Sequence, residues 1–416
     1  MKPEVNRRQF LGRSLRGASI AAASYGRVLG ANNKLMVANI GCGRRNLLKE
    51  LIQVRPDTGI EIRAVCDTWK VRREKAAAEV KEFTGQDARQ VVRYADVLAM
   101  PDIDAVVIAT PDHLHARMLA DAARAGKDVY VEKPIAMNMA ELIEAVDAVK
   151  KHKRVVQVGT QMRSYPQTAA ARRLVTGGGL GQILKVEQAR NGYKPYWMGY
   201  GGAEFNSVKP RPEDIDWDAF LMGRKSRPFD PKQYVGWYGY RDFSGGPQTN
   251  LMVHFIDIVH YICGVTTPSK AVGLGGIYRW HDTYDVPDSV EIAFEYPEQF
   301  LVRYCTVFGN SGGKFAKWFG TRGTMDAQNL SPRRPWRVSG DGSGEPDRIE
   351  NPSELPMEKR PHHMQNWLDC IRTREDPVAP IDAGYAHAVA VIMGDKALTS
   401  GRRQIYLPGS REVREG

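Results

Sequence analysis

The segment DIDAVVIATPDHLHARMLADAARAGKDVYVEKPIAMN, residues 102–138, decides the fold of this 416-residue chain. It opens with an unbroken apolar run at 105–109, which is typical of a parallel strand covered on both faces. Apolar residues then recur at helical spacing over 114–122, and Gly126 stands where helices commonly end. A second strand is predicted over 128–131, so the segment is a βαβ unit.

Glu132, Lys133 and Pro134 follow the second strand directly. Ligands of open α/β sheets bind beyond the carboxyl ends of the strands. Lys133 is therefore a candidate catalytic residue. The alternative is that it is a surface lysine that follows a strand.

A glycine turn lies upstream, in LMVANIGCGRRN at 35–46. A strand is predicted over 35–40 and a helix from Leu47 onward. Gly41 allows a tight turn, and Gly43 lets backbone amides approach a pyrophosphate at the helix N-terminus. Asn46 stands where a third glycine is usual, so an ordinary glycine turn also fits the motif.

The next predicted strand, 60–65, leads to Asp67. A carboxylate there can accept hydrogen bonds from an adenosine ribose, which favours NAD. Arg72 and Arg73 follow closely, and an arginine can pair with the extra phosphate of NADP, so NADP stays open.

Several motifs together resemble the glucose-fructose oxidoreductase, inositol dehydrogenase and rhizopine catabolism (Gfo/Idh/MocA) family. They extend over nearly all of the chain after Gly30: GCG (41–43), TPDHLHA (110–116), VEKPIAMN (131–138), VGTQMRS (158–164), GGLG (178–181), DWDAFL (216–221), SGGPQTNLMVHFIDIVHYICG (244–264) and HHMQNWLDCIRT (362–373).

The resemblance implies an α/β fold in two parts. Residues 31–160 are expected to form an NAD(P)-binding Rossmann domain, a doubly wound parallel sheet. Residues 161–416 are expected to form a substrate-binding α/β domain with C-terminal helices and an open, mostly antiparallel sheet that often serves as an oligomer interface. Independently, β-rich runs predict strands at 183–189, 271–277, 289–296, 300–308 and 314–319, and residues 331–356 predict an exposed loop.

Three residues are predicted to carry the chemistry. Lys133 matches the family lysine of the EKP motif. His254, on a helix predicted over 249–263, matches the family histidine and is suited to accept a hydroxyl proton, although a histidine on an apolar helix also fits a core position. Asn250 stands where the family has aspartate, so the ordinary proton relay is in doubt.

We assign the remaining site residues from the same motifs. The expected substrate-binding residues are Gln161, Arg163, Trp237, Asn250 and His254. The expected cofactor-binding residues are Gly41, Cys42, Gly43, Arg44, Arg45, Asn46, Asp67, Thr110, Pro111, His113, His115, Glu132 and Lys133.

No metal site is predicted. The five cysteines lack the spacing of a disulfide framework or a zinc site. Asp257 and His260 follow His254 at helical spacing, which leaves metal-ligand geometry open, but we expect Asp257 to orient a neighbour and His260 to be structural. Aromatic residues in the stretch 192–244 could stack on a sugar or pack an irregular loop: Tyr193, Tyr196, Trp197, Tyr200, Trp237, Tyr238 and Tyr240.

The first thirty residues are interpreted as a targeting segment. NRRQFLG, residues 6–12, resembles a twin-arginine export signal with paired Arg7 and Arg8, which implies a periplasmic protein; a basic arm is the alternative. This segment carries nearly half of the +11 formal charge, and the rest is spread out. We therefore expect no nucleic-acid partner, and without a long apolar run we expect no membrane segment.

Three functions follow from these residues. The first is an NAD(P)-dependent oxidoreductase acting on a sugar, polyol or derivative, with tightly held cofactor. The second is an NAD-dependent glycosidase or lyase that oxidises its substrate transiently. The third is a non-catalytic sugar-binding relative, which Asn250 makes more credible.

Overall fold

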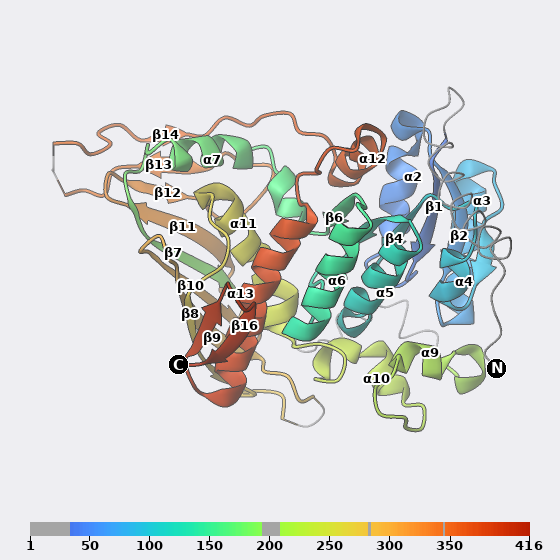
Figure 1. Cartoon of the computed structure of the whole chain (residues 1–416). Helices are drawn as coiled ribbons and strands as arrows, with labels where there is room; N and C mark the ends of the chain where they lie inside the picture. Colours follow the sequence, from blue (N-terminus) through green and yellow to red (C-terminus); the bar gives the residue numbers. More distant parts are fainter. Residues whose placement is uncertain (1–33, 194–208, 282–283, 344–345) are drawn as a thin grey trace, which may run out of the picture.

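The computed structural model of this chain describes residues 34–193, 209–281, 284–343 and 346–416. Two β-sheets dominate the described residues, one of six strands and one of ten (Figure 1). The predicted signal at 1–30 lies outside them, as do Tyr196, Trp197 and Tyr200. No helix in the described ranges combines the length and apolar character that a membrane span requires.

The N-terminal sheet is parallel throughout, in the order β3-β2-β1-β4-β5-β6. Strand β4 is buried along its whole length, as its unbroken apolar run predicted. This strand order is that of a doubly wound dinucleotide-binding fold, and the predicted Rossmann domain is confirmed. The strands are β1 (Met36–Ile40), β2 (Glu61–Cys66), β3 (Arg89–Val91), β4 (Ala105–Ile108), β5 (Asp128–Val131) and β6 (Val156–Val158).

Helices connect these strands and cover the sheet. Two of them end at a glycine with left-handed backbone, α2 at Gly59 and α3 at Gly85. Helix α6 begins where the Asn138 side chain accepts a hydrogen bond from the Glu141 N–H at 3.0 Å. The helices are α2 (Leu47–Thr58), α3 (Lys70–Thr84), α4 (Tyr94–Leu98), α5 (Asp112–Arg124) and α6 (Met139–Lys151).

The C-terminal sheet has the order β14-β13-β12-β11-β7-β10-β9-β8-β15-β16. Its neighbours pair antiparallel except β7 with β10, so the predicted mostly antiparallel sheet is confirmed. The strands are β7 (Ile183–Arg190), β8 (Lys270–Gly276), β9 (Ser289–Glu295), β10 (Leu301–Val307), β11 (Lys314–Gly320), β12 (Thr324–Asp326), β13 (Arg337–Ser339), β14 (Ser353–Glu354), β15 (Gln404–Leu407) and β16 (Glu412–Glu415).

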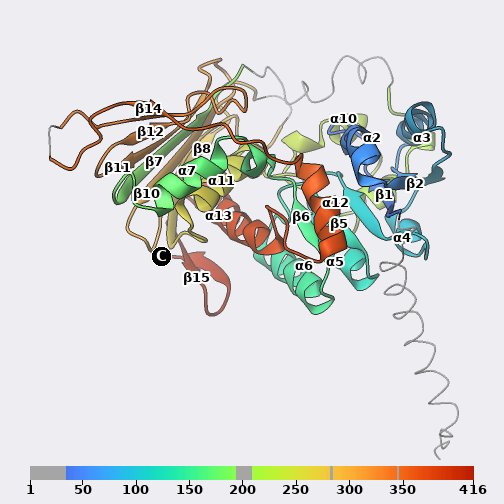
Figure 2. The same cartoon turned by 90° about the horizontal axis from the view of Figure 1, so that it is seen from above.

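Helix α13 (Ile381–Ser400) joins the two halves. It packs on β8 and β9 of the large sheet and also contacts α6 and β6 of the N-terminal domain, so it lies between the sheets (Figures 1 and 2). Helix α11 (Val253–Cys263) packs beside it, and α7 (Thr168–Thr176) packs on α11. One hydrophobic core therefore runs from the Rossmann domain into the second sheet.

One segment predicted as a loop is partly strand. Residues 331–356 contain the short strands β13 and β14, which extend the edge of the large sheet. Helix α12 (His363–Thr373), which belongs to the part of the chain expected as the second domain, packs on α2 of the first, where Trp367 and Leu368 join its core. The chain thus returns to the N-terminal domain after the large sheet.

Candidate active site

A cavity of about 710 Å³ opens at the carboxyl ends of β1, β2, β4 and β5. Its other walls come from α9 (Trp217–Leu221), α10 (Pro231–Val235) and the turn at 248–254. Most of the predicted site residues line it: Gly41, Gly43, Arg44, Arg45, Asp67, Thr110, Pro111, His115, Glu132, Lys133, Trp237, Asn250 and His254.

The glycine turn forms one wall of this pocket. Gly41 has φ +90°, and a Cβ there would lie 2.5 Å from the Ala109 carbonyl oxygen, so only glycine fits. A Cβ on Gly43 would make ordinary van der Waals contact with the Arg72 guanidinium, 3.4 Å away, and would meet no backbone, so the main chain of this turn is open to the pocket that Gly43 lines. Asn46, in the place of the third glycine, has a left-handed φ of 39° directly before α2. The turn therefore leaves room for a pyrophosphate beside the helix N-terminus.

Asp67 lies at the end of β2, within reach of this turn. Its carboxylate accepts hydrogen bonds from the Cys42 N–H and the Trp69 N–H, both at 2.9 Å. The Arg72 guanidinium lies over the Trp69 ring, 5.1 Å from its centroid, and also lines the pocket. A carboxylate for a ribose and an arginine for a phosphate are thus both present, and the geometry fits NAD and NADP.

Lys133 lies deep in the pocket, after β5 and before a cis peptide bond to Pro134. Its ammonium donates to the Asn250 carbonyl oxygen at 2.9 Å and to Asn250 Oδ1 at 3.5 Å. Burial lowers the pKa of Lys133, while the carboxylates of Glu132 and Asp112 oppose that effect. The lysine is therefore a half-buried cation held by groups from both domains.

Glu132 is already paired. Its carboxylate accepts from Arg45 Nε at 2.7 Å and from Gln161 Nε2 at 3.1 Å. Burial alone would raise the pKa of Glu132, but Arg45 and then Lys133 bring it below its ordinary value. Gln161 thus orients Glu132 and is outside the pocket lining.

His254 faces Lys133 across the pocket from the first turn of α11. The predicted single helix over 249–263 begins instead as a π-turn, η5 (Gln248–Met252), before α11. Burial, with help from the Lys133 charge, lowers the pKa of His254 to about 3. Its buried Nδ1 has no hydrogen-bond partner among the described residues. The imidazole is therefore neutral at neutral pH and can accept a proton, but its lowered pKa makes it a weak base unless a bound substrate or cofactor changes the surrounding charge.

Asp112, at the start of α5, was not predicted as a site residue. Its Oδ2 accepts from Asn250 Nδ2 at 2.7 Å and from Ser244 Oγ at 2.9 Å. The signal available in the sequence was its place directly after Thr110 and Pro111 at the end of a strand. Its partners Ser244 and Asn250 lie 132 and 138 residues further along the chain, so motif spacing does not indicate the contact.

Several predicted site residues point elsewhere. The Arg163 guanidinium donates to the buried Asp257 carboxylate at 2.8 Å, outside the pocket lining. His113 Nε2 bonds the Phe220 carbonyl at 2.8 Å. Cys42 and Asn46 contribute backbone to the turn without lining the cavity.

Asp257 and His260 are also buried in the core, where they bind other side chains. Asp257 binds Arg163 and His387 Nδ1, the latter at 2.9 Å, while His260 Nε2 bonds the Tyr296 hydroxyl at 2.8 Å. Among the residues placed by the structure, no cluster of histidine, cysteine, aspartate or glutamate has metal-binding geometry.

The fold and this pocket define a two-domain α/β protein with a dinucleotide-type site. Residues 35–160 match the Gfo/Idh/MocA model described as the oxidoreductase family's NAD-binding Rossmann fold. Residues 222–405 and 165–273 match two models described as the C-terminal α/β domain of the oxidoreductase family. These matches span both halves, so the chain belongs to the Gfo/Idh/MocA oxidoreductase family, and its N-terminal domain is NAD-binding.

Individual proteins are similar over shorter stretches. A levoglucosan dehydrogenase of Pseudarthrobacter phenanthrenivorans is 29% identical over 48% of this chain and 42% of its own length. A scyllo-inositol 2-dehydrogenase (NAD⁺) of Bacillus subtilis is 32% identical over 36% of this chain and 43% of its own. The chain thus spans less than half the length of these curated relatives.

Solved structures match over nearly their whole length. An aldose-aldose oxidoreductase from Caulobacter crescentus superposes with a TM-score of 0.66 at 19% identity, covering 89% of this chain and 99% of that one. A levoglucosan dehydrogenase in complex with NADH also gives 0.66 at 19% identity, covering 92% and 99%. At this identity the likeness establishes the fold.

Proposed function

We propose that the chain is an NAD-dependent oxidoreductase acting on a CH–OH group of a sugar, polyol or sugar derivative, with NADP as the alternative cofactor. The observation that supports this most is that Lys133 and His254 line the same pocket as the glycine turn and Asp67. Relatives named as levoglucosan and inositol dehydrogenases support the substrate class.

The residues present fit a nicotinamide dinucleotide. The main chain at Gly43, which lines the pocket, suits the pyrophosphate, and Asp67 or Arg72 would meet the adenosine ribose or its phosphate. When bound, the nicotinamide ring supplies the hydride acceptor for alcohol oxidation.

The chain's own residues transfer the proton and stabilise the charge that develops on the substrate. Oxidation of an alcohol releases a hydride from carbon and a proton from oxygen. His254 accepts the hydroxyl proton, and the Lys133 ammonium stabilises the negative charge that develops on that oxygen. In the reverse direction the same groups return the proton to the carbonyl oxygen.

A redox-neutral reaction is the second candidate. Glycosyl hydrolase family 109 proteins of Shewanella are 28% identical over 37% of this chain, and a 2,7-anhydro-N-acetylneuraminate hydratase is 33% identical over 29%. A glycosidase or lyase of this kind would oxidise the substrate transiently, eliminate a group and return the hydride. A non-catalytic sugar-binding protein, suggested by Asn250, is the third.

The proposal extends to compartment and cofactor cycle. If the segment at 6–12 exports the folded protein to the periplasm, no soluble NAD pool is present to replace a reduced cofactor. The cofactor would then stay bound and be regenerated on the protein. Replacing Arg7 and Arg8 with lysine should retain the chain in the cytoplasm, whereas unchanged export would remove this part of the proposal.

We also propose a homo-oligomer formed through the large sheet. One of its faces exposes the apolar side chains of Val272, Leu274 and Leu301, with Leu274 77% exposed. Replacing Leu274 and Leu301 with aspartate should give a monomer in light scattering, and an unchanged assembly would place the interface elsewhere.

The deciding experiment is cofactor analysis followed by a screen of sugars, polyols and glycosides. NADH accumulation in proportion to an oxidised product supports the dehydrogenase. Product without net NADH supports the redox-neutral alternative. Sugar binding without any turnover or nicotinamide content supports the non-catalytic protein.

A further inference from the structure

Of the two carboxylates near the Lys133 ammonium, one is paired with an arginine and the other is not. The charged or titratable groups that face the ammonium are Glu132, Asp112, Arg45 and His254. Glu132 is paired with Arg45 Nε at 2.7 Å, and His254 is neutral. The remaining negative charge near the lysine is Asp112.

Asp112 has no cation bonded to it among the described residues. Its carboxylate is 2% exposed, and its hydrogen bonds come from the neutral groups of Ser244, Asn250 and, at 3.4 Å, Thr249. Burial raises the pKa of Asp112, and His115 and Lys133 act against that rise. A buried carboxylate held by neutral donors is costly unless a nearby cation compensates it.

The Asn250 amide connects the two charges. Its Nδ2 donates to Asp112 Oδ2 at 2.7 Å, and its Oδ1 accepts from Lys133 Nζ at 3.5 Å, close to the 2.9 Å bond that Lys133 makes to the Asn250 carbonyl. The opposite amide orientation would place NH₂ against the ammonium and oxygen against the carboxylate, so the charges themselves determine it. A carboxylate on one side polarises the amide toward the lysine on the other.

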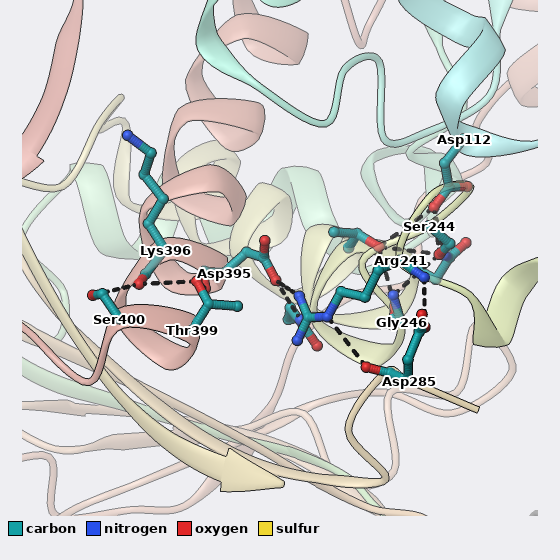
Figure 3. Close-up of polar contacts among 12 residues, drawn as sticks. Asp112, Arg241, Ser244, Gly246, Asp285, Asp395, Lys396, Thr399 and Ser400 are labelled. Atoms are coloured by element: carbon teal, nitrogen blue, oxygen red, sulfur yellow. Dashed lines mark hydrogen bonds and ion pairs between the residues drawn. The ribbon is translucent and has the colours of Figure 1, made fainter. Parts of the chain in front are cut away.

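Figure 3 shows how the surrounding contacts hold this arrangement. Asp112 projects from the start of α5 toward Ser244, whose hydroxyl also accepts from the Gly246 N–H at 3.1 Å. Arg241 lies beside this turn and binds Asp395 at 2.8 Å and the Asp285 carbonyl at 3.4 Å. The segment carrying Asn250 is therefore fixed against α5 of the other domain.

We propose that Asp112 is a positioning residue of this active site: it supplies the negative charge that holds Lys133 protonated and oriented, and it acts through the Asn250 amide. The inference rests on the proposed function, because it assigns Asp112 a part in the same chemistry. It also accounts for an uncharged residue at position 250, since the carboxylate stands one hydrogen bond away, on α5.

The test measures the pKa of Lys133 directly in the full chain, by competitive labelling with acetic anhydride across a pH series and mass spectrometry. Asp112→Asn should lower it by about one unit or more, because a close counter-ion is lost. The exchange variant Asp112→Asn with Asn250→Asp should restore most of that loss, because it returns a carboxylate to the same hydrogen-bonded pair. Asp395→Asn, which removes a carboxylate bound to Arg241 and Gln248 instead, is the matched control and should leave Lys133 unchanged.

Thermal unfolding of each variant separates this role from a structural one. A folded Asp112→Asn protein with an unchanged Lys133 pKa overturns the proposal. If that variant does not fold, the exchange variant decides: a wild-type pKa supports the proposal, and a lowered one overturns it. Failure of both to fold also counts against it, because the carboxylate would then serve the fold.

A second readout uses turnover. With a substrate from the sugar screen, Asp112→Asn should shift the midpoint of the alkaline limb of the pH–rate profile to lower pH. The shift should equal the fall in the pKa of Lys133. If the wild-type chain oxidises no sugar or polyol, the proposed function fails, while the labelling experiment still decides the role of Asp112.

Discussion

The Lys133 ammonium donates a 2.9 Å hydrogen bond to the main-chain carbonyl of Asn250, which ties the end of strand β5 to the π-turn before α11. The lysine of the Rossmann domain is thus positioned by the second domain. The site is therefore built from residues of both domains where the two pack together.

Replacing Lys133 with alanine should lower turnover on the order of 100-fold or more, because the oxygen of the substrate loses its charged donor. Cofactor affinity should stay nearly unchanged, since the lysine is assigned to the reacting oxygen. Lys185→Ala, on the second sheet, is a control for loss of a positive charge. Steady-state rates and a cofactor titration check both parts; unchanged turnover would remove Lys133 from the mechanism.

Gly43→Val should weaken nicotinamide cofactor binding strongly while the protein remains folded. The new side chain would first meet the end of Arg72, which can move, and would then occupy the space assigned to the pyrophosphate. Calorimetric titration with NAD measures the effect. Normal affinity would mean that the cofactor lies elsewhere.

Gly41→Ala, two residues earlier in the same turn, should act on the fold instead. With φ at +90° and the Ala109 oxygen 2.5 Å from the new Cβ, the turn must distort. We expect a loss of about 1–3 kcal/mol in the free energy of unfolding. Denaturant unfolding measures it, and an unchanged midpoint would show that the turn has a different backbone.

Asp257→Asn should destabilise the protein by about 3–5 kcal/mol, because it leaves the buried Arg163 without its partner. The exposed pair Arg411 and Asp147, 2.7 Å apart, offers a matched control. Asp147→Asn should cost no more than about 1 kcal/mol. Equal effects in the two variants would contradict the assignment of Asp257 to the core.

Stability should fall on acidification from pH 7.5 to pH 5. Burial lowers the pKa of His113, His254 and His260 to about 3 and that of His363 to about 4. The unfolded chain binds protons at these histidines near pH 6.5, whereas the folded chain does not, so lower pH favours unfolding. Melting temperatures across this range test the sign, and His260→Gln should reduce the slope. A flat profile would mean that these histidines titrate normally.

The elements predicted best were those with local signals. The unbroken apolar run located β4 within a residue, and the apolar spacing followed by Gly126 located α5 within about two residues, because burial on two faces and helix termination leave signals in neighbouring residues. Strands β13 and β14 were missed since they have three and two residues, too few for an alternating pattern.

The site was predicted less completely for a different reason. Arg163 was assigned to the substrate, but its partner Asp257 lies 94 residues further along the chain. Asp112 and Asn250 are 138 residues apart and meet because the two domains pack together. Contacts between residues so far apart in the sequence depend on how the chain folds, so they cannot be predicted from the spacing of residues within a motif.

The most direct test of the account is the redox state of nicotinamide on the purified protein when sugars and polyols are added. We predict that a member of this panel reduces cofactor on the wild-type chain, seen as reduced-nicotinamide absorbance together with the oxidised sugar by mass spectrometry, and that Lys133→Ala binds the cofactor without reducing it. A folded wild-type protein that neither binds nicotinamide nor changes its redox state with any sugar, polyol or glycoside would contradict the central claim.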